Sequence, residues 1–138
     1  MKIVSACLAD IKCNYKGESK PNQRIIDLVK KGEAIPVCPE QLGGLPTPRP
    51  PAEQMGDKVF NKNGEDVTEY FVRGANEVLR IAVIYNCKEA ILKSKSPSCG
   101  FGQVYDGNFT ETLIRGNGIT ADLLIANGIK VYTEENFK

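Results

Sequence analysis

The 138-residue chain has 41% hydrophobic and 25% charged side chains, enough apolar material for one domain, residues 1–138, to bury a core without disulfides. Its net charge of +1 gives no basic surface for nucleic acids or acidic membranes, and no apolar stretch approaches the roughly 20 residues of a membrane span. The five cysteines are an odd number, and there is no histidine, so any chemistry must use thiols, carboxylates, hydroxyls, lysines or a cofactor. We expect a cytoplasmic protein with neither a nucleic-acid nor a membrane partner. These numbers leave its oligomeric state open between monomer and dimer.

The first part of the chain predicts two strands joined by a helix. The apolar run at 2–6 is a better first strand than a signal peptide, because it is short and carries a single lysine. The helix at 21–32 tolerates Pro21 in its first turn and ends at Gly32. A second short apolar strand follows at 34–37.

The middle of the chain is dominated by a segment rich in proline and glycine. Residues 38–56 contain five prolines and three glycines, which predicts a stiff, irregular loop. The stretch 59–67, VFNKNGEDV, is typical of a small hairpin with Asn63-Gly64 as its turn.

The second half predicts alternating helices and strands. Asp66 and Glu69 have the spacing of a capping box and would open the longest helix, at 67–86. The remaining expected elements are a strand at 89–93, a short hairpin around Asp106-Gly107, a helix at 118–128 and a last strand at 129–133. This alternation predicts an α/β fold: a single three-layer domain with a mostly parallel sheet and helices on both faces.

Three cysteines follow three of the predicted strands. Cys7 ends the first strand, Cys38 ends the second, and Cys99 lies in the loop that leaves the third. Ligands bind at the carboxyl ends of the strands in an open parallel sheet, so we expect these thiols to meet at one rim of the sheet. The alternative is that each is a small buried hydrophobic residue, as we expect for Cys87.

Three thiolates at one rim repel each other, and a bound cation relieves that repulsion. Sulfur ligands without histidine favour an iron–sulfur cluster, zinc or copper(I). Zinc would require a fourth ligand, which Cys13 could supply; Cys13 could equally hydrogen bond to a ligand or pack in the core.

Polar residues beside these cysteines could carry proton transfer. Glu40 lies two residues after Cys38, and a carboxylate is the natural proton carrier in a site that has no histidine. Ser96 and Ser98 flank a proline just before Cys99 and could donate hydrogen bonds to a substrate or to sulfur. The alternatives are a solvated loop glutamate and serines that cap a turn.

The segment after Glu40 adds candidate substrate-binding residues. Gly43 and Gly44 could allow the backbone to approach a ligand, and they lead toward Arg49 in the same loop. The guanidinium of Arg49 could bind a substrate carboxylate, phosphate or carbonyl, or it could pair with Glu53.

Five blocks of the sequence, in order, resemble the bacterial TudS-like family of thiouracil desulfidases, long catalogued as a domain of unknown function. The blocks are VSACLADIKCNYKG, IPVCPEQLGGLPTPRPPAE, NGEDVTEYFVRGA, AILKSKSPSCG and YDGNFTETLIRGNGITADLL. The likeness extends over essentially the whole chain, so it is more specific than any single motif.

The resemblance implies an α/β domain that carries a [4Fe–4S] cluster on Cys7, Cys38 and Cys99. The implied reaction is a non-redox, hydrolytic release of sulfide from a small thiolated substrate such as 2-thiouracil, whose sulfur binds the open iron of the cluster. By motif, Glu40 would transfer protons and Ser96 would assist it, while Ser98 would bind substrate.

One loop departs from the family pattern. The family usually has an arginine and an acidic residue where this chain has Asn14 and Lys16.

The alternative function is that of a non-catalytic protein that binds an iron–sulfur cluster or zinc, or that transfers sulfur.

Overall fold

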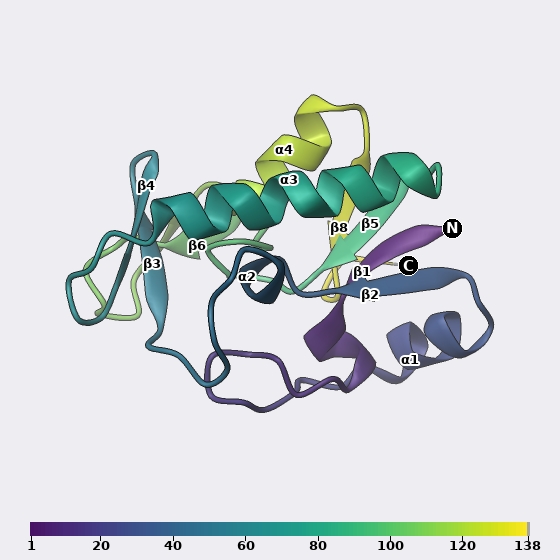
Figure 1. Ribbon diagram of the computed structural model, residues 1–138, viewed down its shortest axis with the longest axis horizontal. Coiled ribbons are helices and arrows are strands. Elements are labelled where there is room, and N and C mark those ends of the chain that lie inside the picture. The colour runs from purple at the N-terminus through teal and green to yellow at the C-terminus, as the bar shows by residue number, and fades with distance from the viewer. Residues whose placement is uncertain (138) are drawn as a thin grey trace.

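The centre of the fold is a four-stranded parallel sheet with helices on both faces (Figure 1). The computed structural model describes residues 1–137. The sheet strands, in spatial order, are β2 (Ala34–Val37), β1 (Lys2–Ser5), β5 (Glu89–Leu92) and β8 (Lys130–Thr133). The α3 (Thr68–Ile84) and α4 (Ile119–Ala126) helices cover one face, and α1 (Gln23–Lys30) with the short 3₁₀ helix η1 (Ala6–Ala9) covers the other. The predicted three-layer α/β fold with a parallel sheet is confirmed.

The two faces of the sheet supply two separate cores. Successive residues on a strand point to opposite faces, so Ile3 and Val4 of β1 enter different cores. Ile3 packs with Val78 of α3 and Leu124 of α4, whereas Val4 packs with Ile25 of α1. All five side chains are at most 1% exposed, so both faces hold the strands firmly in place.

The first helix begins two residues later than predicted. Asn22 caps it, because its side-chain oxygen accepts hydrogen bonds from the backbone N–H groups of Arg24 and Ile25. Pro21 therefore precedes the cap instead of lying in the first turn.

The predicted capping box of α3 is wrong. The Asp66 carboxylate accepts a hydrogen bond from the backbone N–H of Thr68 at 3.0 Å, but Glu69 turns outward and pairs with Arg73 at 2.8 Å. No helix in residues 1–137 is both long and apolar enough to cross a bilayer.

The segment 38–56 is more regular than its composition indicated. It contains the short helix α2 (Pro39–Leu42) and the strand β3 (Ala52–Met55). The β3 strand pairs antiparallel with β4 (Lys58–Asn61). The predicted hairpin at 59–67 is present on the other side of β4, because Asp66 forms an antiparallel bridge with Phe60 and the backbone N–H of Val67 donates to the carbonyl oxygen of Val59. The turn that ends at Gly64 is present as expected.

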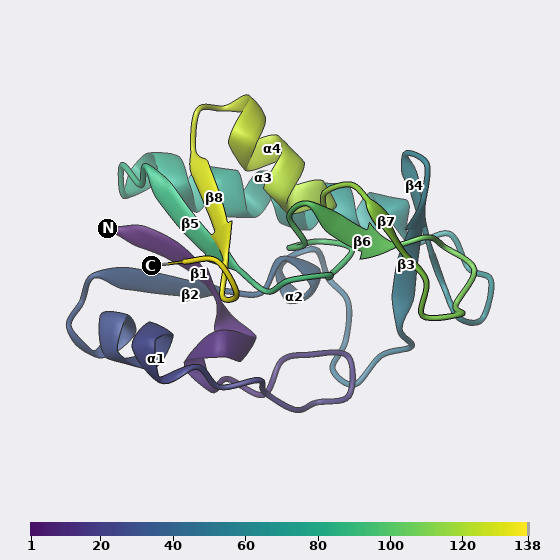
Figure 2. The same cartoon turned by 180° about the vertical axis from the view of Figure 1, so that it is seen from behind.

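A second hairpin lies beside the first, away from the sheet (Figure 2). It pairs β6 (Gln103–Tyr105) with β7 (Leu113–Arg115), which confirms the predicted hairpin with a longer loop. The Glu53 carboxylate of β3 joins the two hairpins by accepting hydrogen bonds from the backbone N–H groups of Gly107 and Phe109.

Helix α2 sits on α3 through two glycines. A Cβ atom at Gly43 would collide with the backbone carbonyl of Tyr70, and one at Gly74 would collide with that of Pro39. The close approach of the two backbones fixes the position of α2, and with it the residues that α2 carries.

Candidate active site

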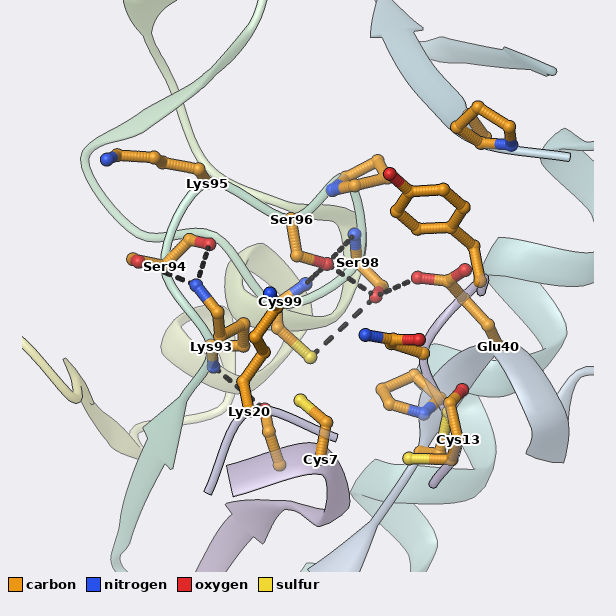
Figure 3. Close-up of a pocket in the computed structure, with 18 of the residues that line it drawn as sticks. Cys7, Cys13, Lys20, Glu40, Lys93, Ser94, Lys95, Ser96, Ser98 and Cys99 are labelled. Carbon is orange, nitrogen blue, oxygen red and sulfur yellow. Dashed lines mark hydrogen bonds between the residues drawn. The ribbon is translucent and has the colours of Figure 1, made fainter. Parts of the chain in front are cut away.

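The strand order places a cavity at the carboxyl ends of β1, β2 and β5. The chain leaves β1 toward α1 on one face of the sheet and leaves β5 toward α4 on the other, so the loops part between these strands. Such a switch point is where open α/β sheets bind ligands. A cavity of about 400 Å³ opens there (Figure 3).

The cavity brings together the three cysteines that follow strands. Cys7 lies in η1 directly after β1, Cys38 precedes α2 at the end of β2, and Cys99 lies in the loop after β5. Cys99 is 4% exposed, and the other two are half-buried. In Figure 3 the sulfur atoms of Cys7 and Cys99 point into the same space.

The electrostatics of these thiols oppose their joint ionisation. Burial raises the pKa of Cys7 to about 11, with the charge of Cys38 adding to the rise and the ammonium of Lys93 opposing it. Burial also raises the pKa of Cys99 to about 12, against a hydrogen bond from Ser5. A cationic metal group among the thiols would offset both burial and repulsion.

Cys38 differs because Cys13 lies next to it. The Cys38 sulfur is 3.6 Å from the backbone carbonyl oxygen of Cys13. A hydrogen bond from the Cys13 thiol lowers the pKa of Cys38 to about 7, although burial acts in the opposite direction. The same hydrogen bond raises the pKa of Cys13, which is 2% exposed. Cys13 thus lies against Cys38, and its backbone carbonyl oxygen accepts the hydrogen bond that the Cys38 thiol donates.

The spacing of the donors fits a cluster better than a single ion. Within residues 1–137, no three cysteine, aspartate or glutamate side chains lie close enough together to hold one metal ion. Zinc requires four ligands within about 2.3 Å of one atom, so the four-cysteine zinc site is not preformed. A four-iron cluster is wider and binds each cysteine through a different iron, which suits thiols spread around a cavity.

The carboxylate of Glu40 faces the serines of the loop after β5. The hydroxyl of Ser98, which is 1% exposed, donates a hydrogen bond to Glu40 Oε2 at 2.9 Å. The Ser96 hydroxyl lies 3.0 Å from that of Ser98, and its oxygen accepts hydrogen bonds from the backbone N–H groups of Ser98 and Cys99. A continuous chain of hydrogen bonds therefore runs from Ser96 through Ser98 to Glu40 (Figure 3).

Arg49 pairs with Glu40, so the alternative pairing with Glu53 is wrong. Arg49 Nε donates to Glu40 Oε1 at 2.9 Å, and the two side chains are 4% and 16% exposed. Glu53 is occupied by the second hairpin instead. Glu40 is thus held from two sides, by Arg49 and by Ser98.

Gly43 and Gly44 do not line the cavity of the cysteines. Gly43 packs against the backbone of α3 at Tyr70. Gly44, with a φ angle of +101°, lines a neighbouring cavity of about 230 Å³ that also touches Tyr70. Their positions serve the packing of α2, and neither reaches the cavity of about 400 Å³.

Sequence reasoning missed the basic side of the cavity. Lys93 follows β5 directly, and its ammonium lies 3.0 Å from Glu134 Oε2, while Ser94 donates to both oxygens of Glu134. Lys20 and Lys95 also line the cavity. Figure 3 shows the Lys93 ammonium beside Ser94 and the Lys95 side chain pointing away from the thiols. The signal used for the cysteines, a polar residue just after a strand, would have found Lys93.

The loop with Asn14 and Lys16, which differs from the family pattern, lies beside the same cavity. The Asn14 side-chain oxygen accepts hydrogen bonds from the backbone N–H groups of Lys16 and Glu18, at 3.0 and 2.8 Å. Asn14 thereby holds its own turn together while lining the cavity with Tyr15.

The protein is thus an α/β domain with a parallel sheet and a thiol-lined ligand cavity at the switch point of that sheet. A family model described as 2-thiouracil desulfurase matches residues 3–136, and the chain belongs to that family. It is 42% identical to the uncharacterized protein YbbK of Bacillus subtilis (strain 168), over 97% of this chain and 95% of that protein. It is also similar to a solved structure of the [4Fe-4S]-dependent thiouracil desulfidase TudS, with a TM-score of 0.94 and 43% identity over 98% of this chain and 91% of that one.

Proposed function

We propose that this protein is an iron–sulfur-dependent desulfidase that releases sulfide from 2-thiouracil or a related thiolated pyrimidine or thioamide. The observation that carries the proposal is the meeting of Cys7, Cys38 and Cys99 around a cavity that also contains Glu40 and Ser96. Membership of the 2-thiouracil desulfurase family and the likeness to TudS support the same substrate class and cofactor.

Cys7, Cys38 and Cys99 would hold a [4Fe–4S] cluster. When bound by three cysteines, such a cluster supplies one iron without a protein ligand, a Lewis acid suited to a soft thiocarbonyl sulfur. Cys13 stays outside the ligand set and lies beside Cys38, whose sulfur is 3.6 Å from the Cys13 carbonyl oxygen.

The reaction is a hydrolysis, in which a C=S group and water become a C=O group and hydrogen sulfide without net electron transfer. The Glu40 carboxylate accepts a proton from the attacking water, since each of its oxygens keeps a lone pair beside its present hydrogen bond. Ser96 assists Glu40 through Ser98: its oxygen accepts from two backbone N–H groups, and its single proton is donated to the Ser98 hydroxyl, which in turn donates to Glu40, until a bound substrate competes for it. Ser98 connects the two.

The remaining parts of the proposal concern the setting of this chemistry. Residues 1–138 act as one domain, and the substrate is a small molecule that fits the cavity of about 400 Å³. The five cysteines are free thiols, which suits the reducing cytoplasm.

The test is anaerobic reconstitution, followed by measurement of iron per chain and of sulfide released from 2-thiouracil. We expect about four irons per chain. Changing Cys7, Cys38 or Cys99 to Ser should abolish iron binding, whereas Cys87→Ser, in the core of the sheet, is the matched control that keeps it. Iron that survives all three ligand variants would refute the assigned ligands.

Glu40→Gln tests the proton-transfer role separately. This variant should keep its iron and lose sulfide release by about 100-fold or more, as is typical for removal of a general base. Undiminished release would assign proton transfer to another group.

A further inference from the structure

Arg49 is a buried side chain whose three guanidinium nitrogens are all engaged by the protein. Nε donates to Glu40 at 2.9 Å, and Nη2 donates to the carbonyl oxygen of Cys13 at 2.9 Å. Nη1 donates to Thr47 Oγ1 at 3.0 Å and to the carbonyl oxygen of Pro46 at 3.2 Å. A guanidinium has five N–H groups, and four of them are committed in this arrangement.

These contacts do not suit a substrate-binding residue, because binding a substrate would require Arg49 to release a protein partner. We propose instead that Arg49 is a positioning residue that fixes the Glu40 carboxylate for proton transfer. This inference rests on the proposed function, since it concerns how Glu40 performs its step. It assigns to Arg49 no contact with the substrate.

The geometry explains how Arg49 acts through Glu40. Ser98 holds Oε2 from the loop after β5, and Arg49 holds Oε1 from the loop after α2, so the carboxylate cannot rotate without breaking a charged hydrogen bond. Arg49 is itself fixed because its other nitrogens bind backbone and hydroxyl oxygens in two loops. The result is a carboxylate held in one orientation beside the cavity.

A lysine could not replace this side chain. The three directions of the guanidinium reach Glu40, the Cys13 carbonyl and the Pro46–Thr47 turn at the same time, whereas a single ammonium cannot span them. Arg49→Lys therefore keeps the charge but loses the planar fork that orients the carboxylate.

Arg49 also lies between two cavities, which allows chemical rescue. It lines both the cavity of about 400 Å³ and the neighbouring one of about 230 Å³. Arg49→Ala would remove the side chain from this shared wall and leave a space that free guanidinium can enter.

The experiment uses reconstituted holoprotein and compares wild type, Arg49→Ala, Arg49→Lys, Glu40→Gln and the double variant Glu40→Gln/Arg49→Lys. Iron per chain and the visible absorption of the cluster are measured with kcat and KM for 2-thiouracil, with and without added guanidinium. Arg80→Ala is the matched control, because Arg80 is an exposed arginine on α3 that pairs with Glu77 on the same helix. Arg49→Lys carries the test if Arg49→Ala does not fold.

We expect Arg49→Ala and Arg49→Lys to keep their iron and lose about 100-fold in kcat, with KM changed by less than about threefold. Guanidinium should restore kcat of Arg49→Ala by about tenfold and leave Glu40→Gln unchanged. In the Glu40→Gln background, Arg49→Lys should cost less than about threefold more, because its target is already lost. The melting temperatures of the single and double variants should likewise be non-additive.

Three results would overturn the inference. A rise in KM with kcat unchanged would make Arg49 a direct substrate ligand. Loss of iron would show that Arg49 acts on the Cys13 loop. A double variant whose kcat loss is the full sum of the two single losses would show that Arg49 does not act through Glu40. A wild type that loads iron but releases no sulfide refutes the proposed function instead. An active wild type with equally active Arg49 variants refutes only the role of Arg49.

Discussion

The close packing of α2 on α3 makes Gly74 a position where one methyl group should disturb the site. A Cβ atom at Gly74 would collide with the backbone carbonyl of Pro39, the first residue of α2. Because the obstacle is backbone, no side chain can rotate away, and α2 must move. That movement displaces Cys38 and Glu40 together, since Cys38 is the residue at the N-cap of α2 and Glu40 lies in its first turn.

The expected magnitude follows from two opposing terms. Alanine is favoured over glycine inside a helix by about 1 kcal/mol. Overpacking of a filled interior costs about 1–3 kcal/mol, and a clash with fixed backbone belongs at the upper end. We expect Gly74→Ala to lower the free energy of unfolding by about 2 kcal/mol, or the melting temperature by about 7 °C in a chain of this length.

The assay is chemical unfolding of Gly74→Ala by urea, combined with iron per chain after reconstitution. Asn76→Ala is the matched control, since Asn76 is exposed on the same helix and its side chain donates a hydrogen bond to the carbonyl oxygen of Val72. Its free energy of unfolding should change by no more than about 0.5 kcal/mol. A Gly74→Ala variant that is as stable as wild type, or more so, with unchanged iron would refute the reasoning that the two backbones are in forced contact.

Two further predictions concern titrating groups. Although burial raises it, hydrogen bonds from Ser94 and Lys93 lower the net pKa of Glu134 below its ordinary value of 4.5. The free energy of unfolding of wild type should therefore exceed that of Glu134→Gln by about 1 kcal/mol well above pH 4.5, since the pair is partly exposed. This difference should shrink as the pH falls through the folded-state pKa of Glu134, and urea unfolding at pH 7 and pH 3.5 measures it. In metal-free protein, iodoacetamide should label Cys38 first, with a rate that rises as the pH passes about 7, and Cys13→Ala should move that rise to higher pH. Labelling of Cys38 that is unaffected by Cys13→Ala would refute the hydrogen bond between them.

The central sheet could be predicted because its strands carry local signals. Runs such as Ala90-Ile91-Leu92 are apolar without alternation, as expected of strands that are buried on both faces, and all three side chains are 0% exposed. The rule that parallel strands place their carboxyl ends together then brought Cys7 and Cys99 to one cavity from sequence alone.

The short elements of the middle segment could not be predicted in the same way. A four-residue helix gives no periodicity, and the only local sign of α2 was Pro39 at its first position, which composition alone assigns to a loop. The β3 strand forms because β4 pairs with it, so its existence depends on a partner and not on its own pattern.

The partner of Arg49 was beyond sequence reasoning for a related reason. Glu53 is closer to Arg49 in sequence than Glu40, but the hairpin directs Glu53 toward Gly107 and leaves Arg49 facing α2. Which carboxylate an arginine reaches depends on how two loops are placed by the sheet and by α3. Sequence distance carries no such information.

The candidate site has two sets of residues, the cysteines proposed as cluster ligands and the residues proposed to transfer protons, and the chain connects the two sets at two points. Glu40 follows Cys38 by two residues, and Ser98 directly precedes Cys99. The 2.9 Å hydrogen bond from Ser98 to Glu40 therefore joins two candidate ligand segments that are distant in sequence. Because Ser98 directly precedes Cys99 and Glu40 follows Cys38 by two residues, a shift of either cysteine would also change the distance between the serine hydroxyl and the carboxylate.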